Sequence, residues 1–78
     1  MNETPPIHKD MAVLDIVAQW TPTQDVFRRY DEKAGECIMC QALFETVETV
    51  AERYGLDLNQ LLRDLNQAAQ DNMGKGVG

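Results

Sequence analysis

Two cysteines separated by two residues, in Cys37-Ile38-Met39-Cys40, carry the most obvious reactive chemistry of this chain. A C-x-x-C pair can close a small disulfide, can bind a metal as two thiolates, or can simply pack. The thioredoxin motif of this spacing belongs to a strand–helix–strand context, which the sequence does not supply. The residues alone therefore leave three hypotheses open: a redox-active dithiol, a metal- or cluster-binding pair, and cysteines without chemistry.

A metal site within one chain lacks ligands. A closed structural zinc site uses four ligands, whereas the chain offers two cysteines and a single histidine, His8, in a polar N-terminal segment. A homodimer would bring two C-x-x-C pairs together and supply four thiolates. We therefore predict no metal ligands and no cofactor for the single chain, and we keep the two-chain metal site as an alternative.

The spacing of the pair also predicts a role for each cysteine. Three residues across a helix start place both sulfurs on one side of the first turn, where free amides and the helix dipole favour a thiolate. On this geometry Cys37 is the outer, attacking thiol, and Cys40 lies nearer the core and resolves a mixed disulfide. The local charge is mixed, since Lys33 favours a thiolate and Glu36 opposes it.

Length and charge restrict the remaining function classes. The 78 residues suffice for one domain, and 13 acidic against 7 basic residues give a net charge of -6. That charge argues against nucleic acid or an anionic membrane as the main partner. No apolar run approaches the roughly 20 residues that span a bilayer, and the N-terminus does not resemble a signal peptide. We expect a cytoplasmic protein, in which a C-x-x-C pair indicates redox or metal chemistry rather than a permanent staple.

Helical periodicity dominates the first half of the chain, and no segment alternates long enough to predict a strand. One helix is expected over about 12–20. The second begins at a Thr21-Pro22 signal, with threonine as the cap and proline at the first helical position. It is expected to end between Tyr30 and Lys33, and an acidic loop over 31–36 is expected to follow.

The third helix is the clearest prediction. Apolar residues recur at three- and four-residue spacing from Leu43 to Tyr54, and Phe44 belongs to the face expected in the core. Gly55 stands where a left-handed cap is needed. Asp57 then provides the cap of a fourth helix.

These elements predict an all-α fold, a compact bundle of four short helices with the C-x-x-C pair at the start of the third. Proline and polar residues predict a flexible arm over 1–9. The periodic part forms a single helical domain over 10–72. Three glycines without periodicity predict a disordered tail over 73–78.

The order of several short motifs resembles the DUF1858 family, which overlaps with the small hybrid-cluster-protein-associated redox disulfide domains. The resemblance covers about residues 8–68. The motifs are residues 9–17, Pro22, Val26-Phe27, the C-x-x-C pair, residues 45–48, residues 54–58, Leu61-Leu62 and Leu65-Asn66. The sequence departs from the family pattern at Ala12, where a threonine cap is usual, and at residues 31–36, where the link before the first cysteine is longer.

The resemblance implies a small helical domain with a redox role. Only Cys37 and Cys40 match a proposed functional motif of the family. The expected function is that of a thiol–disulfide redox or iron–sulfur-associated accessory domain, acting on an unidentified protein partner such as a redox or iron–sulfur protein. The alternatives are a metal- or cluster-binding homodimer and a non-catalytic protein-interaction module.

Overall fold

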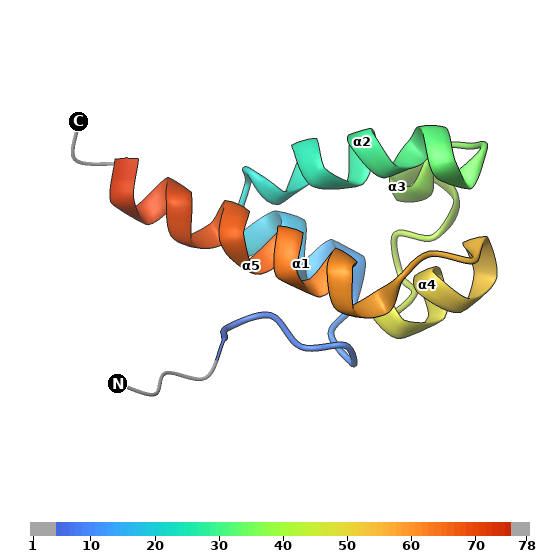
Figure 1. The fold of residues 1–78 in the computed structure, drawn as a ribbon, viewed down its shortest axis with the longest axis horizontal. Helices are drawn as coiled ribbons and strands as arrows, with labels where there is room; N and C mark the ends of the chain where they lie inside the picture. Colours follow the sequence, from blue (N-terminus) through green and yellow to red (C-terminus); the bar gives the residue numbers. More distant parts are fainter. Residues whose placement is uncertain (1–4, 76–78) are drawn as a thin grey trace.

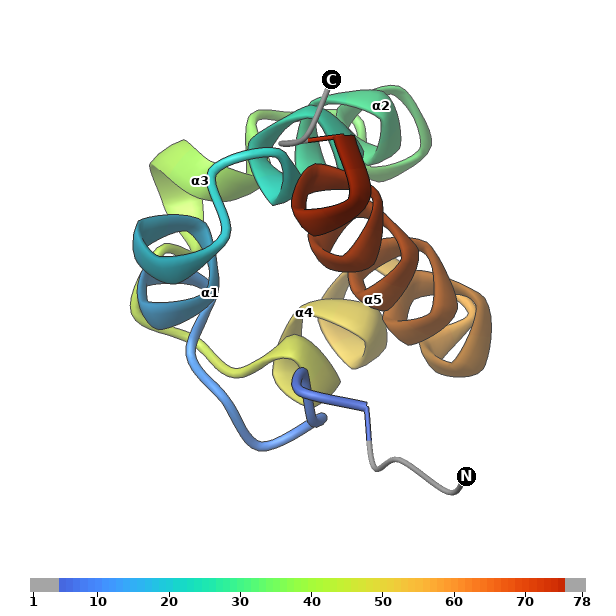
Figure 2. The same ribbon diagram turned by 90° about the vertical axis from the view of Figure 1, so that its left-hand side faces the viewer.

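The computed structural model describes the backbone of residues 5–75 and the side-chain surroundings of residues 5–70. Within these described residues five helices follow one another: α1 Val13–Gln19, α2 Thr23–Ala34, α3 Ile38–Gln41, α4 Val47–Tyr54 and α5 Leu58–Lys75. Figure 1 shows α2 lying above α1 and α5, and Figure 2 shows the helices arranged around a common centre. The all-α bundle is confirmed, with the C-x-x-C pair at the start of the third helix.

Side chains from every helix fill that centre. Phe27 of α2, Ile16 of α1 and Ile38 of α3 are fully buried, as are Leu61 and Leu65 of α5. Every buried side-chain nitrogen or oxygen within the described residues has a hydrogen-bond partner. None of the described helices combines the length and the apolar composition needed to cross a membrane.

The start of α1 is capped by the backbone of a distant segment. Ala12 is the N-cap residue and offers no side-chain bond. Instead the amide of Val13 donates to the carbonyl of Glu45 at 2.9 Å, and the amide of Leu14 donates to that of Leu43 at 2.8 Å. Because these carbonyls satisfy two of the free amides at the helix start, alanine is sufficient at the cap position.

The start of α4 is held in the reciprocal way. Thr46 is its N-cap and accepts the amide of Thr49 at 3.1 Å. The next amide, that of Val47, donates to the carbonyl of Met11 at 3.1 Å, and Ala12 and Thr46 form an isolated antiparallel bridge. The two helix starts therefore fix one another, which positions the segment between α3 and α4.

Helix α2 departs from its predicted cap. Pro22, and not Thr21, is the N-cap residue, and it makes no side-chain cap bond. The hydroxyl of Thr23 is buried and donates to the carbonyl of Trp20 at 2.5 Å. The expected threonine cap is therefore wrong, because the chain enters α2 through a tight turn stabilised by the following threonine.

The acidic segment before the cysteines is mostly helical. Helix α2 continues to Ala34, and Gly35 ends it in the left-handed region with φ 82°. The loop predicted over 31–36 is thus the last turn of α2 followed by a glycine cap. This difference places Asp31 on a helix that packs against α3.

The long third helix predicted from periodicity is two helices. Helix α3 has four residues, and a turn closed by the bond from the Glu45 amide to the Ala42 carbonyl separates it from α4. The restart at Thr46 interrupts the periodic face, so Phe44 falls on the turn and is 80% exposed. The prediction that Phe44 lies in the core is wrong.

The transition into α5 matches the sequence signals. Gly55 adopts φ 67°, and the amide of Leu56 folds back to the carbonyl of Ala51 at 2.8 Å. The carboxylate of Asp57 accepts the amide of Gln60 at 3.1 Å. Helix α5 continues to Lys75, past residue 73 where the tail is expected to begin, and 76–78 lie outside the described residues.

The N-terminal segment is joined to α5 by one side chain. Asn66 accepts the amide of Ile7 at 2.9 Å and donates to the carbonyl of Ile7 at 3.1 Å. Ile7 is 2% exposed and belongs to the core. The flexible arm predicted over 1–9 is therefore corrected at Ile7, which packs on the bundle, while residues 1–4 lie outside the described part.

Candidate functional site

The two cysteines form a disulfide across the single turn of α3. Their Cα atoms lie 5.2 Å apart, and Cys40 comes three positions after Cys37 in the sequence. Cys37 is the N-cap residue of α3 in an extended conformation, and Cys40 lies within the helix. The structure thus brings together the two residues that the sequence selects.

One backbone amide points at the disulfide. The amide of Cys40 donates to Sγ of Cys37 at 3.1 Å. The helix behind this amide has only four residues, so its dipole is smaller than that of the long helix expected from the sequence. The local amide, rather than a helix macrodipole, is what favours negative charge on Cys37 when the disulfide opens.

The exposure of the two cysteines is opposite to the prediction. Cys40 is exposed and Cys37 is half-buried. Ile38 anchors α3 in the core, and the half-buried Met39 packs against it. Because α3 is a single turn anchored by Ile38, Cys40, two positions later, faces solvent. The sequence-based description of Cys37 as the outer cysteine is therefore wrong.

Two carboxylates are fixed beside this turn. Asp31, on the last turn of α2, accepts the amide of Ile38 at 2.9 Å. Glu36, the residue before Cys37, accepts a hydrogen bond from the hydroxyl of Tyr54 at the end of α4. This hydrogen bond is the main reason why the pKa of Tyr54 is raised. Both carboxylates disfavour negative charge on a nearby sulfur, against the effect of the amide.

Two cationic side chains of α2 contact other residues of the same helix. The ammonium of Lys33 lies over the ring of Tyr30, 5.4 Å from its centre. Arg28 pairs with Asp25 at 3.3 Å on the exposed side of α2. The contacts that the structure shows beside the cysteines therefore come from an amide and from carboxylates.

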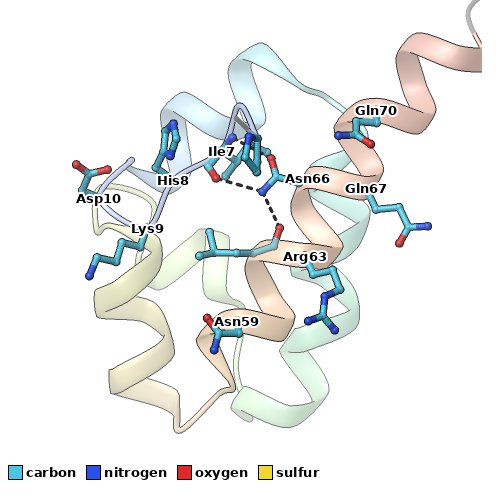
Figure 3. Close-up of a pocket in the computed structure, with 11 residues that line it drawn as sticks. Ile7, His8, Lys9, Asp10, Asn59, Arg63, Asn66, Gln67 and Gln70 are labelled. Atoms are coloured by element: carbon cyan, nitrogen blue, oxygen red, sulfur yellow. Dashed lines mark hydrogen bonds between the residues drawn. The ribbon is translucent and has the colours of Figure 1, made fainter. Parts of the chain in front are cut away.

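A broad hollow in the described structure lies away from the cysteines. It has a volume of about 1070 Å³ and separates the N-terminal segment from α5. Figure 3 shows His8, Lys9 and Asp10 along one side, with Asn66 reaching across to Ile7. Neither cysteine lines it. This hollow is open to solvent, and it marks where the N-terminal segment joins the bundle.

The structure offers no metal centre within the part of the chain that it describes. No three His, Cys, Asp or Glu side chains gather there in a way that could hold a metal ion. His8 lies in the hollow on α5, which the cysteines do not line. A metal site built by two chains remains a prediction.

The sequence places Asp31 in the expected acidic loop over 31–36 and does not reveal its bond to α3. That bond joins residues seven positions apart across the Gly35 turn. The only local signal is an acidic residue one helical turn before a glycine that ends a helix. Such a signal does not reveal which amide the carboxylate accepts, because the turn decides where α3 begins.

Comparisons with known proteins give no relative. No family model matches the chain, and no curated protein or solved structure matches it significantly. The candidate site therefore depends on the geometry of this chain alone, and the resemblance to the DUF1858 family stays a prediction.

Proposed function

We propose that this chain is a small thiol–disulfide redox domain, in which the Cys37–Cys40 disulfide is opened and closed by a protein partner. The observation that supports it is a disulfide across one exposed helical turn, with Cys40 open to solvent. An amide donates to Sγ of Cys37 at 3.1 Å. One sulfur is thus accessible to attack, and the other can leave as a stabilised thiolate.

The position of the disulfide does not suit a structural staple. A disulfide stabilises a fold mainly by closing a loop in the unfolded chain. A four-residue loop contributes about 2 kcal/mol in this estimate, against about 4.7 kcal/mol for a 100-residue loop. Cys37 and Cys40 flank the same turn and join no distant elements. A reversible role therefore fits the position better than a stabilising one.

The exchange proceeds in two steps when the partner is a reduced dithiol. A partner thiolate attacks Sγ of Cys40, the S–S bond breaks, and its electron pair passes to Sγ of Cys37, which then takes a proton. The second partner thiolate attacks the partner's own sulfur in the mixed disulfide and releases the thiolate of Cys40. The partner loses two electrons and two protons, and the domain gains them. This order makes Cys37 the resolving thiol, in place of the attacking role predicted from sequence.

Equilibration in glutathione redox buffers tests the proposal. We expect the disulfide fraction to change across ratios poised between roughly -300 and -120 mV, the range of reversible protein dithiols. Alkylation of free thiols followed by mass spectrometry measures this fraction. A pair that stays fully reduced or fully oxidised over the whole range contradicts a redox role.

The single-cysteine variants test the order of the steps. Cys37→Ser leaves the exposed Cys40, and Cys40→Ser leaves the half-buried Cys37. We expect Cys37→Ser to form a mixed disulfide with oxidised glutathione several times faster than Cys40→Ser does, when the two rates are compared at equal thiolate fraction. If Cys40→Ser reacts faster, Cys37 is the attacking thiol and the order given above is wrong.

The wider parts of the proposal follow the family resemblance. They are membership of the DUF1858 family, an association with iron–sulfur proteins, and a cytoplasmic location. Elemental analysis of protein purified anaerobically addresses the alternative of a metal- or cluster-binding homodimer. Stoichiometric zinc or iron, lost in the Cys37→Ser, Cys40→Ser double variant, would replace the redox proposal.

A further inference from the structure

Two large hydrophobic side chains are exposed among the residues whose surroundings the structure describes, one on α1 and one on the turn that follows the helix of the disulfide. Phe44 is 80% exposed and Leu14 is 37% exposed. The amide of Leu14 donates to the carbonyl of Leu43, the residue before Phe44, at 2.8 Å. The fold therefore joins the backbone segments that carry these two residues, although about thirty residues separate them in the sequence.

The disulfide lies within reach of the same partner. Phe44 follows Cys40 by four residues, so their Cα atoms are at most about 14 Å apart. A standard protein interface covers about 800 Å² on each partner, which is wide enough to include both. Phe44 also stands on a short turn whose carbonyls are bonded to the start of α1. The turn therefore holds the aromatic side chain outward on a rigid base.

The charge around these residues indicates the character of the partner. Asp15 follows Leu14, and Glu45 follows Phe44. The chain as a whole carries a net charge of -6. Opposite charge steers partners together and like charge separates them. A second copy of this acidic chain is therefore disfavoured, and a basic segment is favoured.

We infer that Phe44 and Leu14 form a docking surface for the protein partner of the disulfide, and that the partner presents a basic, apolar segment carrying a dithiol. We call these two residues the apolar patch. This inference depends on the proposed function, since it names the class of partner for the exchange at Cys40. Docking of an apolar side chain on the patch places the partner thiol beside the exposed cysteine and raises the rate of attack.

Two synthetic dithiol peptides serve as probes. Both contain a C-x-x-C sequence, one flanked by leucine and lysine and the other by serine and glutamate. The measured quantity is the rate at which each reduced peptide opens the disulfide of the full-length domain. Each rate is divided by the rate of the same peptide with oxidised glutathione, which corrects for the thiol acidity of the peptide. Dithiothreitol provides a reference rate for each domain variant.

We expect the leucine–lysine peptide to react about tenfold faster than the serine–glutamate peptide. In the double variant Leu14→Ser, Phe44→Ser the leucine–lysine rate, relative to that of dithiothreitol, should fall about tenfold. The matched control is Leu62→Ser, which removes a partly buried leucine from the hollow on α5. This control should keep the peptide preference.

Three outcomes would overturn the inference. Equal rates for the two peptides, or a double variant that keeps the preference, reject the patch while leaving disulfide exchange intact. A preference for the serine–glutamate peptide rejects the charge argument. Self-association of the oxidised domain that disappears in Phe44→Ser assigns the patch to a second copy instead. Failure of dithiothreitol to open the disulfide is a separate result, because it rejects the proposed function itself.

Discussion

Replacing Asp31 with asparagine should accelerate the opening of the Cys37–Cys40 disulfide. The Asp31 carboxylate accepts the amide of Ile38 at 2.9 Å, which fixes a negative charge at the start of α3. Attack on Cys40 pushes negative charge onto Sγ of Cys37, so this carboxylate opposes the reaction. Asparagine keeps the acceptor oxygen and nearly the same shape, so Asp31→Asn removes the charge while keeping the contact.

The size of the effect follows from Coulomb's law. The hydrogen bond and the intervening covalent bonds place the Asp31 carboxylate roughly 7 Å or less from Sγ of Cys37. At about 7 Å two unit charges interact by about 0.6 kcal/mol in water and about 2.4 kcal/mol at an effective dielectric constant of 20. The cysteine turn lies at the surface, so we take about 1 kcal/mol. That value corresponds to an approximately fivefold faster reduction.

The assay follows reduction of the oxidised domain by dithiothreitol under pseudo-first-order conditions at low salt. Asp25→Asn is the matched control, because Asp25 lies on the same helix and its exposed carboxylate pairs with Arg28. In 1 M salt the Debye length shrinks to about 3 Å, so the acceleration should fall towards twofold or less. Equal rates for Asp31→Asn and Asp25→Asn at low salt would refute the electrostatic reasoning.

Three further predictions concern the fold around the site. Asn66→Ala should cost about 2–3 kcal/mol, because it removes three hydrogen bonds made to Ile7 and Leu62. Urea unfolding measures this loss. Burial, followed by the hydrogen bond to Asp64, raises the pKa of Tyr30 from its ordinary value of 10.0 to about 12. The stability that depends on the protonated tyrosine is complete below pH 10, and it should fall by about 2 kcal/mol towards pH 12; alkaline unfolding of Tyr30→Phe should lack this fall. Gly35→Ala should cost about 1 kcal/mol, since φ is 82° there and a left-handed residue with a side chain is strained; thermal unfolding measures it.

Each of these predictions has a control and a contradicting result. Asn59→Ala is the control for Asn66→Ala, because it changes an exposed asparagine on the same helix. If the two variants lose the same free energy of unfolding, the contact from Asn66 to Ile7 is not stabilising. The control Tyr54→Phe should still lose stability between pH 10 and pH 12. If the Tyr54→Phe variant does not lose stability over this range, Tyr30 is not the cause of the loss. Gly35→Asn should cost less than Gly35→Ala, because asparagine tolerates the left-handed region. The reverse order would point to a cause other than backbone strain.

The sequence by itself determined the local elements and the reactive pair. The glycine cap at Gly55 and the aspartate cap at Asp57 are where their residue types predict, because such signals act within one turn of the chain. The three-residue spacing of Cys37 and Cys40 also sufficed to predict sulfurs that meet. Helical periodicity was enough for an all-α bundle.

Tertiary structure decided which residues face the solvent around that pair. The backbone of residues 43 and 45 caps α1, which fixes the turn between α3 and α4 and leaves Phe44 exposed. Ile38 enters the core, so Cys40 and not Cys37 is outermost. Neither result follows from periodicity, because hydrogen bonds between segments thirty residues apart select one turn among several that the local sequence permits. The sequence was thus enough to identify the reactive pair, whereas packing determined its orientation.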